Sequence, residues 1–169
     1  SFPTRRSSDL LSEQMVKRLK GEIIAKSGGP PKIKKMPKGD HGEAVRHGIE
    51  VYNTLCITCH LADGKGADNL APPLANSDWV TGSTERLIRI ALHGVQGPIE
   101  VNGSRYRHPE IMPGLGLALK DQQIADVLTY IRTAWGGKSQ VEEKDVKRIR
   151  AAHKDRVIPW DVKELLKLK

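Results

Sequence analysis

The chain has 169 residues, of which 38% are hydrophobic and only 4% aromatic, and its formal net charge is +8. This length suits one domain with extensions. The sequence has no apolar run of the roughly 20 residues needed to cross a bilayer, so we expect no transmembrane segment in this fragment. Residues 40–137 hold eight Lys and Arg against eleven Asp and Glu, so the basic charge lies in the flanks, and without aromatic residues in the basic stretch 32–38 we expect no nucleic-acid partner.

The N-terminal 41 residues divide into two parts. Residues 1–10 look like a translated sequencing adapter, so we treat them as a non-native artefact and expect the natural N-terminus to be missing. Residues 11–41 are predicted to form an amphipathic helix, from Leu11 to Lys26, followed by a Lys/Pro linker.

A second helix is predicted from Gly42 to about Leu61, at the start of a central domain that spans residues 42–137. Its apolar face carries residues at helical spacing: Val45, Gly48, Ile49 and Tyr52. The helix leads directly into the only two cysteines of the chain.

Those cysteines belong to the sequence Cys56-Ile57-Thr58-Cys59-His60. C-x-x-C-H is the attachment pattern for c-type haem: two thiols add to the vinyl groups of one porphyrin, and the histidine binds the iron. A zinc site would need a second pair of ligands, and a redox dithiol is typical of a βαβ setting that this sequence lacks. The motif therefore predicts one haem c, covalently bound through Cys56 and Cys59, with His60 as an iron ligand.

The remainder of the central domain reads as helices around one hairpin. After a Gly/Pro loop at 62–76, a short helix is predicted from Ser83 to His93, and a longer one from Lys120 to Trp135. Between them, residues 99–106 carry an Asn-Gly pair flanked by β-prone residues, which predicts a two-residue hairpin. The pattern indicates an all-α fold with a small β-hairpin before the last helix.

A second axial ligand for the iron is expected downstream, and Met112 is the preferred candidate. It precedes Pro-Gly in the loop before the last helix, and its thioether is a soft ligand that suits low-spin haem iron. His108 and His93 are the next candidates, and Met36 and Met15 are further methionines. We expect the attachment residues and Met112 to line one cleft whose walls are Leu70, Leu74, Leu87, Ile88, Val95, Leu115 and Leu128.

The C-terminal extension, residues 138–169, holds two capping-box patterns. One begins at Ser139 and the other at Asp161, where Trp160 and Leu165 could form a hydrophobic staple around the helix start. The apolar side chains near Trp160 would lose free energy if left in water. We expect this helical extension to fold back over the central domain with Trp160 as its anchor; the alternative is that it docks on a missing upstream domain.

Residues from about Gly42 to Gly137 resemble a class I cytochrome c domain. Gly48 with Tyr52, and Val127 with Tyr130, match the positions where the first and last helices of that family cross. The segment 70–74, Leu-Ala-Pro-Pro-Leu, matches the loop whose proline carbonyl accepts a hydrogen bond from the haem-ligating histidine. The resemblance assigns that carbonyl to Pro72, with Pro73 as the alternative, and it implies His60 and Met112 as axial ligands.

Three further segments, 72–80, 92–99 and 124–132, resemble the cytochrome module that ends large bacterial membrane-bound-dehydrogenase-like proteins of the sugar or sorbosone type. This resemblance implies a periplasmic or exported electron carrier rather than an enzyme. Its donor would be an upstream dehydrogenase domain or subunit, and its acceptor a cytochrome or oxidase. The alternative is a haem enzyme or sensor with an open sixth position, which ligation by Met112 would exclude.

Overall fold

The computed structural model describes residues 18, 21–22, 30–33, 35–67, 70–106, 112–136 and 140–168. The expected artefact at 1–10 and most of the expected helix at 11–26 lie outside these residues, as do the candidate ligands Met15 and His108. The expectations for those segments therefore stay predictions.

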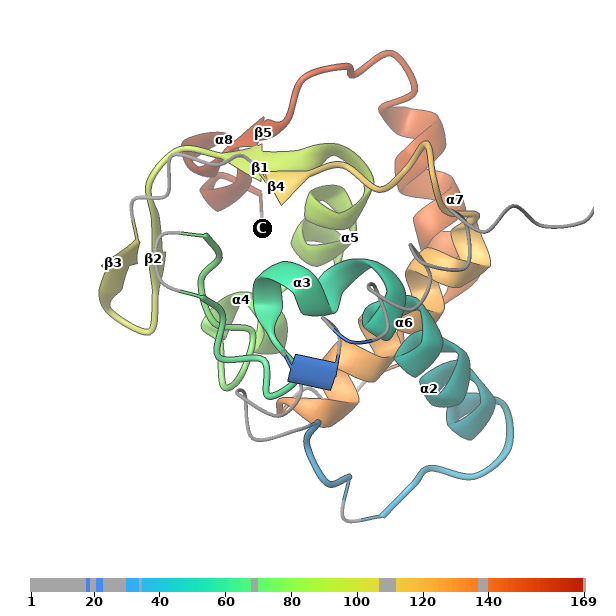
Figure 1. The fold of residues 1–169 in the computed structure, drawn as a ribbon. Coiled ribbons are helices and arrows are strands. Elements are labelled where there is room, and N and C mark those ends of the chain that lie inside the picture. Colours follow the sequence, from blue (N-terminus) through green and yellow to red (C-terminus); the bar gives the residue numbers. More distant parts are fainter. Residues whose placement is uncertain are drawn as a thin grey trace, which may run out of the picture.

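The predicted second helix is present, but it changes its winding before the cysteines. Helix α2 spans Gly39–Val51, the π-helical turn η1 spans Tyr52–Cys56, and α3 spans Ile57–His60 (Figure 1). The helix begins three residues before its predicted start, and Leu61, with φ of 60°, ends it. A π turn adds a residue to one turn of helix and is frequent at functional sites.

Helix α6, Asp121–Ala134, packs across α2 at the predicted glycine. A Cβ atom built on Gly48 would lie 2.7 Å from the Cβ of Tyr130, so only glycine permits this approach. The rings of Tyr52 and Tyr130 meet edge to face, with centroids 5.3 Å apart. The expected crossing of the first and last helices is confirmed.

The predicted hairpin is also present. Strands β2, Ile99–Val101, and β3, Ser104–Tyr106, pair antiparallel around Asn102 and Gly103, whose φ angles are 51° and 76°. Both angles lie in the left-handed region that an Asn-Gly turn requires. Hydrogen bonds join Asn102 to Asp78, the first residue of helix α4, Asp78–Thr81, so the hairpin is held against that helix.

A second, three-stranded sheet was not expected from the sequence. Its strands are β1, Gly94–Gln96, β4, Met112–Pro113, and β5, Trp160–Asp161. The central strand β1 follows helix α5, Thr84–His93; it pairs antiparallel with β4 and parallel with β5. The sheet joins the predicted ligand segment, the central domain and the C-terminal extension.

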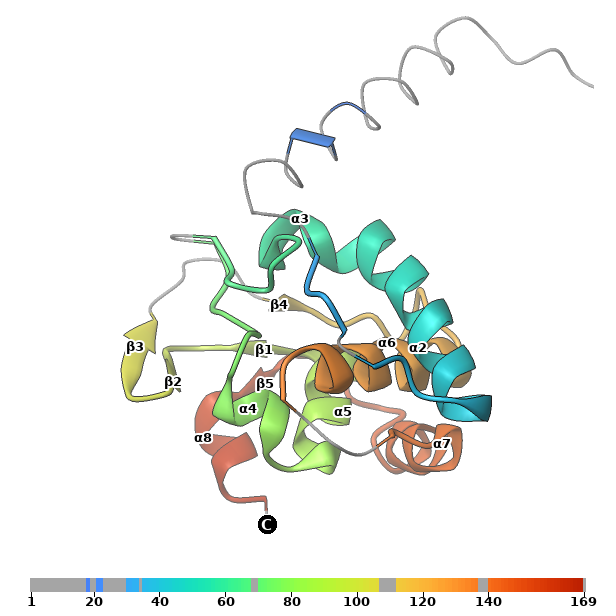
Figure 2. The ribbon, with the colours of Figure 1, turned by 90° about the horizontal axis from the view of Figure 1, so that it is seen from below.

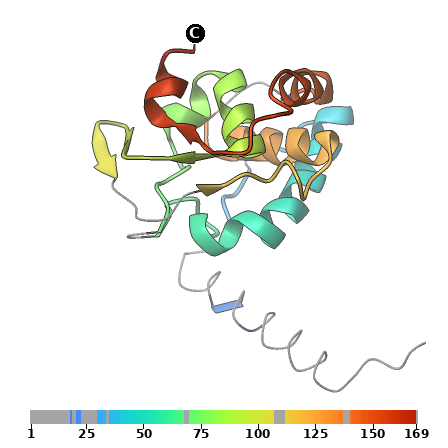
Figure 3. The same ribbon diagram turned by 90° about the horizontal axis from the view of Figure 1, so that it is seen from above.

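The C-terminal extension packs on the central domain through helices α7, Glu143–Ala152, and α8, Val162–Leu166. Figures 2 and 3 show both helices on the face of the domain opposite α3. Trp160 and Leu165 are buried in one cluster with Trp79 and Ile90, as a folded-back extension requires. The capping box at Asp161 is confirmed.

Ser139 lies outside the described residues, but residues 140–142 are not helical, so the predicted helix start is wrong. Glu142 is the N-cap residue of α7, one turn later, and its side chain makes no capping hydrogen bond. Val141 N–H instead donates to the Thr129 hydroxyl of α6, at 2.9 Å. This contact holds the chain extended before α7, because a local capping preference is weaker than burial against α6.

Two histidines are enclosed where the extension meets α5. The ring centroids of His93 and His153 lie 6.1 Å apart, and the ring of Trp160 lies against both. Neither Nε2 atom has a hydrogen-bond partner among the described residues. Burial lowers the pKa of both histidines, and the neighbouring guanidinium groups of Arg89, Arg150 and Arg156 lower it further.

We predict that replacing Gly48 with alanine destabilises the haem-bearing protein by about 1–3 kcal/mol, because the added methyl group would overpack the contact of α2 with α6. Chemical denaturation of the two holoproteins measures the difference. Glu43→Ala, on the exposed face of α2, is the control and should leave stability within about 0.5 kcal/mol. Equal midpoints for Gly48→Ala and the parent protein would show that the helices do not depend on this close approach.

We predict that acid weakens the packing of the C-terminal extension. In the unfolded chain both histidines take up protons below about pH 6.5, whereas burial lowers their pKa in the fold, so the folded state takes up fewer protons at the same pH. The unfolded state then binds more protons, so the unfolding free energy falls as pH decreases below about 6.5. Denaturation midpoints across that range should fall less steeply in the double variant His93→Gln/His153→Gln, and an unchanged slope would contradict the assignment.

Candidate haem site

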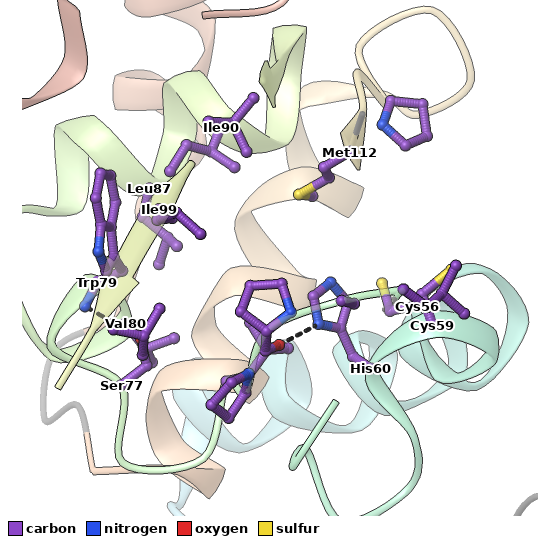
Figure 4. Close-up of a pocket in the computed structure, with 18 of the residues that line it drawn as sticks. Cys56, Cys59, His60, Ser77, Trp79, Val80, Leu87, Ile90, Ile99 and Met112 are labelled. Carbon is purple, nitrogen blue, oxygen red and sulfur yellow. Dashed lines mark hydrogen bonds between the residues drawn. The ribbon is translucent and has the colours of Figure 1, made fainter. Parts of the chain in front are cut away.

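The C-x-x-C-H residues lie on the wall of one deep cavity. Cys56 ends η1, and Cys59 and His60 lie in α3; the imidazole is buried, and both thiols are half-buried and free of a disulfide. Figure 4 shows the three side chains with Met112 around the same space. The cavity has a volume of about 390 Å³.

Apolar side chains from several elements form the rest of this wall. The expected residues that do line it are Leu70, Leu74, Leu87, Val95 and Leu115. Two expected residues do not: Ile88 and Leu128 are buried in the main core instead. Further wall residues lie on α4, α5 and the hairpin and were not expected from the sequence: Trp79, Ile90, Ile99 and Val101. The alternation of Ile99 and Val101 along one strand was the available signal, since such residues share a face.

The carbonyl oxygen of Pro72 lies 3.3 Å from His60 Nδ1. A neutral imidazole that donates from Nδ1 leaves the lone pair of Nε2 free, and Figure 4 shows that second nitrogen on the side of the ring that faces Met112. Burial lowers the pKa of His60 to about 4 despite this hydrogen bond. The ring is therefore neutral at neutral pH and able to bind a metal ion.

The two thiols lie in surroundings that suit a large apolar group. Burial, with a smaller contribution from Cys59, raises the pKa of the Cys56 thiol to about 12, so this thiol is uncharged at neutral pH. Among the described residues, no group of three or more His, Cys, Asp or Glu side chains could hold a metal ion. The cavity thus fits a flat apolar ligand with thiol attachment better than a bare zinc ion.

Met112 lies in β4, where it pairs with Val95 of β1. Its half-buried side chain lines the cavity, and Figure 4 shows its sulfur turned into the same space as His60. Met36 is exposed and does not line the cavity. His93 packs against His153 and Trp160 instead. Of the candidate second ligands that the structure describes, Met112 alone reaches the cavity.

A comparison with known protein families shows which family has this arrangement of residues. A family model described as "Cytochrome c" matches residues 45–135, which is more than half of the chain. The chain belongs to the cytochrome c family. This cytochrome carries a covalently bound haem c, and its C-x-x-C-H motif supplies the two attaching cysteines, Cys56 and Cys59.

The relatives include a cytochrome and the cytochrome subunits of dehydrogenases. Cytochrome c-552 of Thermus thermophilus is 37% identical over 114 residues, which cover 62% of this chain and 84% of the relative. The cytochrome c subunit of the quinone alcohol dehydrogenase of Gluconacetobacter polyoxogenes is 37% identical over 107 residues, 61% of this chain and 22% of the relative. The gluconate 2-dehydrogenase cytochrome c subunit of Pantoea cypripedii is 36% identical over 123 residues, 67% of this chain and 25% of the relative.

The cytochrome therefore transfers electrons, and the domain acts as an electron carrier. The match spans a quarter or less of each of the two dehydrogenase subunits. Among the helices that the structure describes, none is long and apolar enough to cross a membrane.

Proposed function

We propose that this cytochrome transfers electrons through a haem with His60 and Met112 as axial ligands. The observation that carries the proposal is that both side chains line one apolar cavity, His60 from α3 and Met112 from β4. When bound, haem supplies a one-electron iron centre. Imidazole and thioether are the ligand pair that gives a higher reduction potential than two histidines.

Three properties of the protein would tune the reduction potential of that iron centre. The Pro72 carbonyl holds the His60 ring in one orientation and raises the basicity of Nε2. The apolar walls exclude water and disfavour the additional positive charge of the oxidised state. The short β4–β1 pairing fixes the backbone at Met112. Pro73 also lines the cavity, but the hydrogen bond of His60 is with the Pro72 carbonyl.

We propose a dehydrogenase, as an upstream domain or a separate subunit, for the electron donor. Support comes from the relatives, which include the cytochrome subunits of alcohol, gluconate and fructose dehydrogenases. A sugar or sorbosone type of parent protein stays an inference from the sequence resemblance. The acceptor would be another cytochrome or an oxidase, and the site of action the periplasm or another exported location, where C-x-x-C-H motifs receive their haem.

The proposed organisation follows from the same observations. Residues 42–137 would form the cytochrome domain, and residues 138–169 an extension that belongs to the same folded unit, since α7 and α8 pack on it.

The ligand assignment predicts the behaviour of Met112→Ala. The variant should lose the weak red absorption band that oxidised haem shows with a bound methionine. Its reduction potential should fall by more than about 59 mV, a tenfold change in the one-electron equilibrium constant. Spectroscopy and potentiometry of the purified holoproteins measure both, with the exposed Met36→Ala as the control.

Retention of the band in Met112→Ala would refute the axial pair. A parent protein that lacks the band and binds carbon monoxide readily would instead favour the alternative function, a haem enzyme or sensor with an open sixth position.

A further inference from the structure

One arginine of the C-terminal extension contacts the segment that follows Met112. Arg150, in α7, donates from Nε to Asp121 Oδ1 at 2.6 Å and from Nη2 to the Leu119 carbonyl at 2.9 Å. Its Nη1 donates to the carbonyl of Gly116. All three acceptors lie in residues 116–121, between β4 and the first residue of α6.

Backbone hydrogen bonds join the start of this segment to the end of α5. Leu115 N–H donates to the Ala91 carbonyl at 2.8 Å, and Gly116 N–H donates to the Leu92 carbonyl at 3.0 Å. A Cβ atom on Gly116 would lie 2.7 Å from the Leu92 oxygen, so the segment is pressed against the end of α5. The same Cβ atom would lie 3.2 Å from Arg150 Nη1, so the guanidinium packs closely at this glycine as well.

A second contact of the extension leads to the same methionine. Val95 of β1 pairs with Met112 on one edge and with Trp160 on the other. The extension thus holds both the strand beside Met112 and the loop after it. Since this loop connects Met112 to α6, any loosening of it would allow the methionine to move away from the cavity.

We propose that Arg150 is a positioning residue for Met112, through which the C-terminal extension sets the strength of the sixth iron ligand. The inference rests on the proposed His60 and Met112 ligation. The guanidinium suits this role because its planar fork directs several N–H groups at fixed angles, which a lysine cannot do. Its ion pair with Asp121 is part-buried, with exposed side-chain fractions of 31% and 21%, and so is less screened than a surface pair.

The test compares Arg150→Ala and Arg150→Lys with Arg148→Ala, all as full-length holoproteins. Arg148 lies in the same helix, and among the described residues its hydrogen bonds and ion pairs are with Glu85 and Asp145. The readouts are the red methionine band and the apparent affinity of the oxidised protein for imidazole, which binds only when Met112 leaves the iron. Both are measured under conditions in which all the proteins are folded.

For Arg150→Ala we expect a weaker band and an imidazole affinity about tenfold or more above the parent value, since loss of charge-assisted hydrogen bonds favours the methionine-free state. Arg150→Lys should shift the affinity in the same direction, and Arg148→Ala should match the parent. If Arg150→Ala fails to accumulate, Arg150→Lys and Asp121→Asn are compared with Arg148→Ala in the same way.

If Arg150→Ala binds imidazole no more tightly than Arg148→Ala does, the role of Arg150 is overturned. If the parent protein also shows the methionine band, the proposed function stays intact. Lower resistance to denaturant without a change in imidazole affinity would likewise overturn the role of Arg150, because it would reduce Arg150 to a structural contact. A parent protein without the band would refute the ligation itself.

Discussion

The close contact between α2 and α6 at Gly48 fixes the frame on which the haem site is built. Because the two backbones meet there, the helix that leads to Cys56 has a single position relative to α6. Tyr52, one turn later, fills the space beyond Gly48: its ring packs against Tyr130 and Trp135, and its hydroxyl donates to the Leu61 carbonyl at 2.7 Å. Leu61 follows His60 directly, so this bond also restrains the end of the helix that presents the imidazole.

Helix α6 supports the opposite wall of the cavity as well. The buried guanidinium of Arg132 donates to the Val80 carbonyl at 2.8 Å and the Gly82 carbonyl at 3.2 Å, and burial lowers its pKa. These bonds tie α6 to the end of α4, whose residues Trp79 and Val80 line the cavity. Helix α6 therefore holds two walls of the cavity in place, and the distance between these walls does not depend on the loops that join them.

Local patterns predicted the parts of the structure that local physics decides. The attachment motif, the Asn102-Gly103 turn and the glycine at the helix crossing each carry a specific chemical or steric requirement. The β4–β1–β5 sheet was not predictable in this way, since its strands have two or three residues and join segments far apart in sequence. Ile88 was placed in the wrong environment for a related reason: neighbouring residues on a helix point about 100° apart, and only the packed structure shows that Leu87 faces the cavity and Ile88 the core.

The π turn η1 separates two parts of one helix whose side chains must face in different directions. Gly48 must face α6, while Cys56, Cys59 and His60 must face the cavity, and both groups lie on one continuous helix. Each residue added to or removed from a helix rotates everything beyond it by about 100°. The wider turn at Tyr52–Cys56 therefore sets the angular phase between the packing face and the attachment face. A change that restored regular winding without removing a residue would rotate the thiols and the imidazole by about that angle, away from the space they enclose.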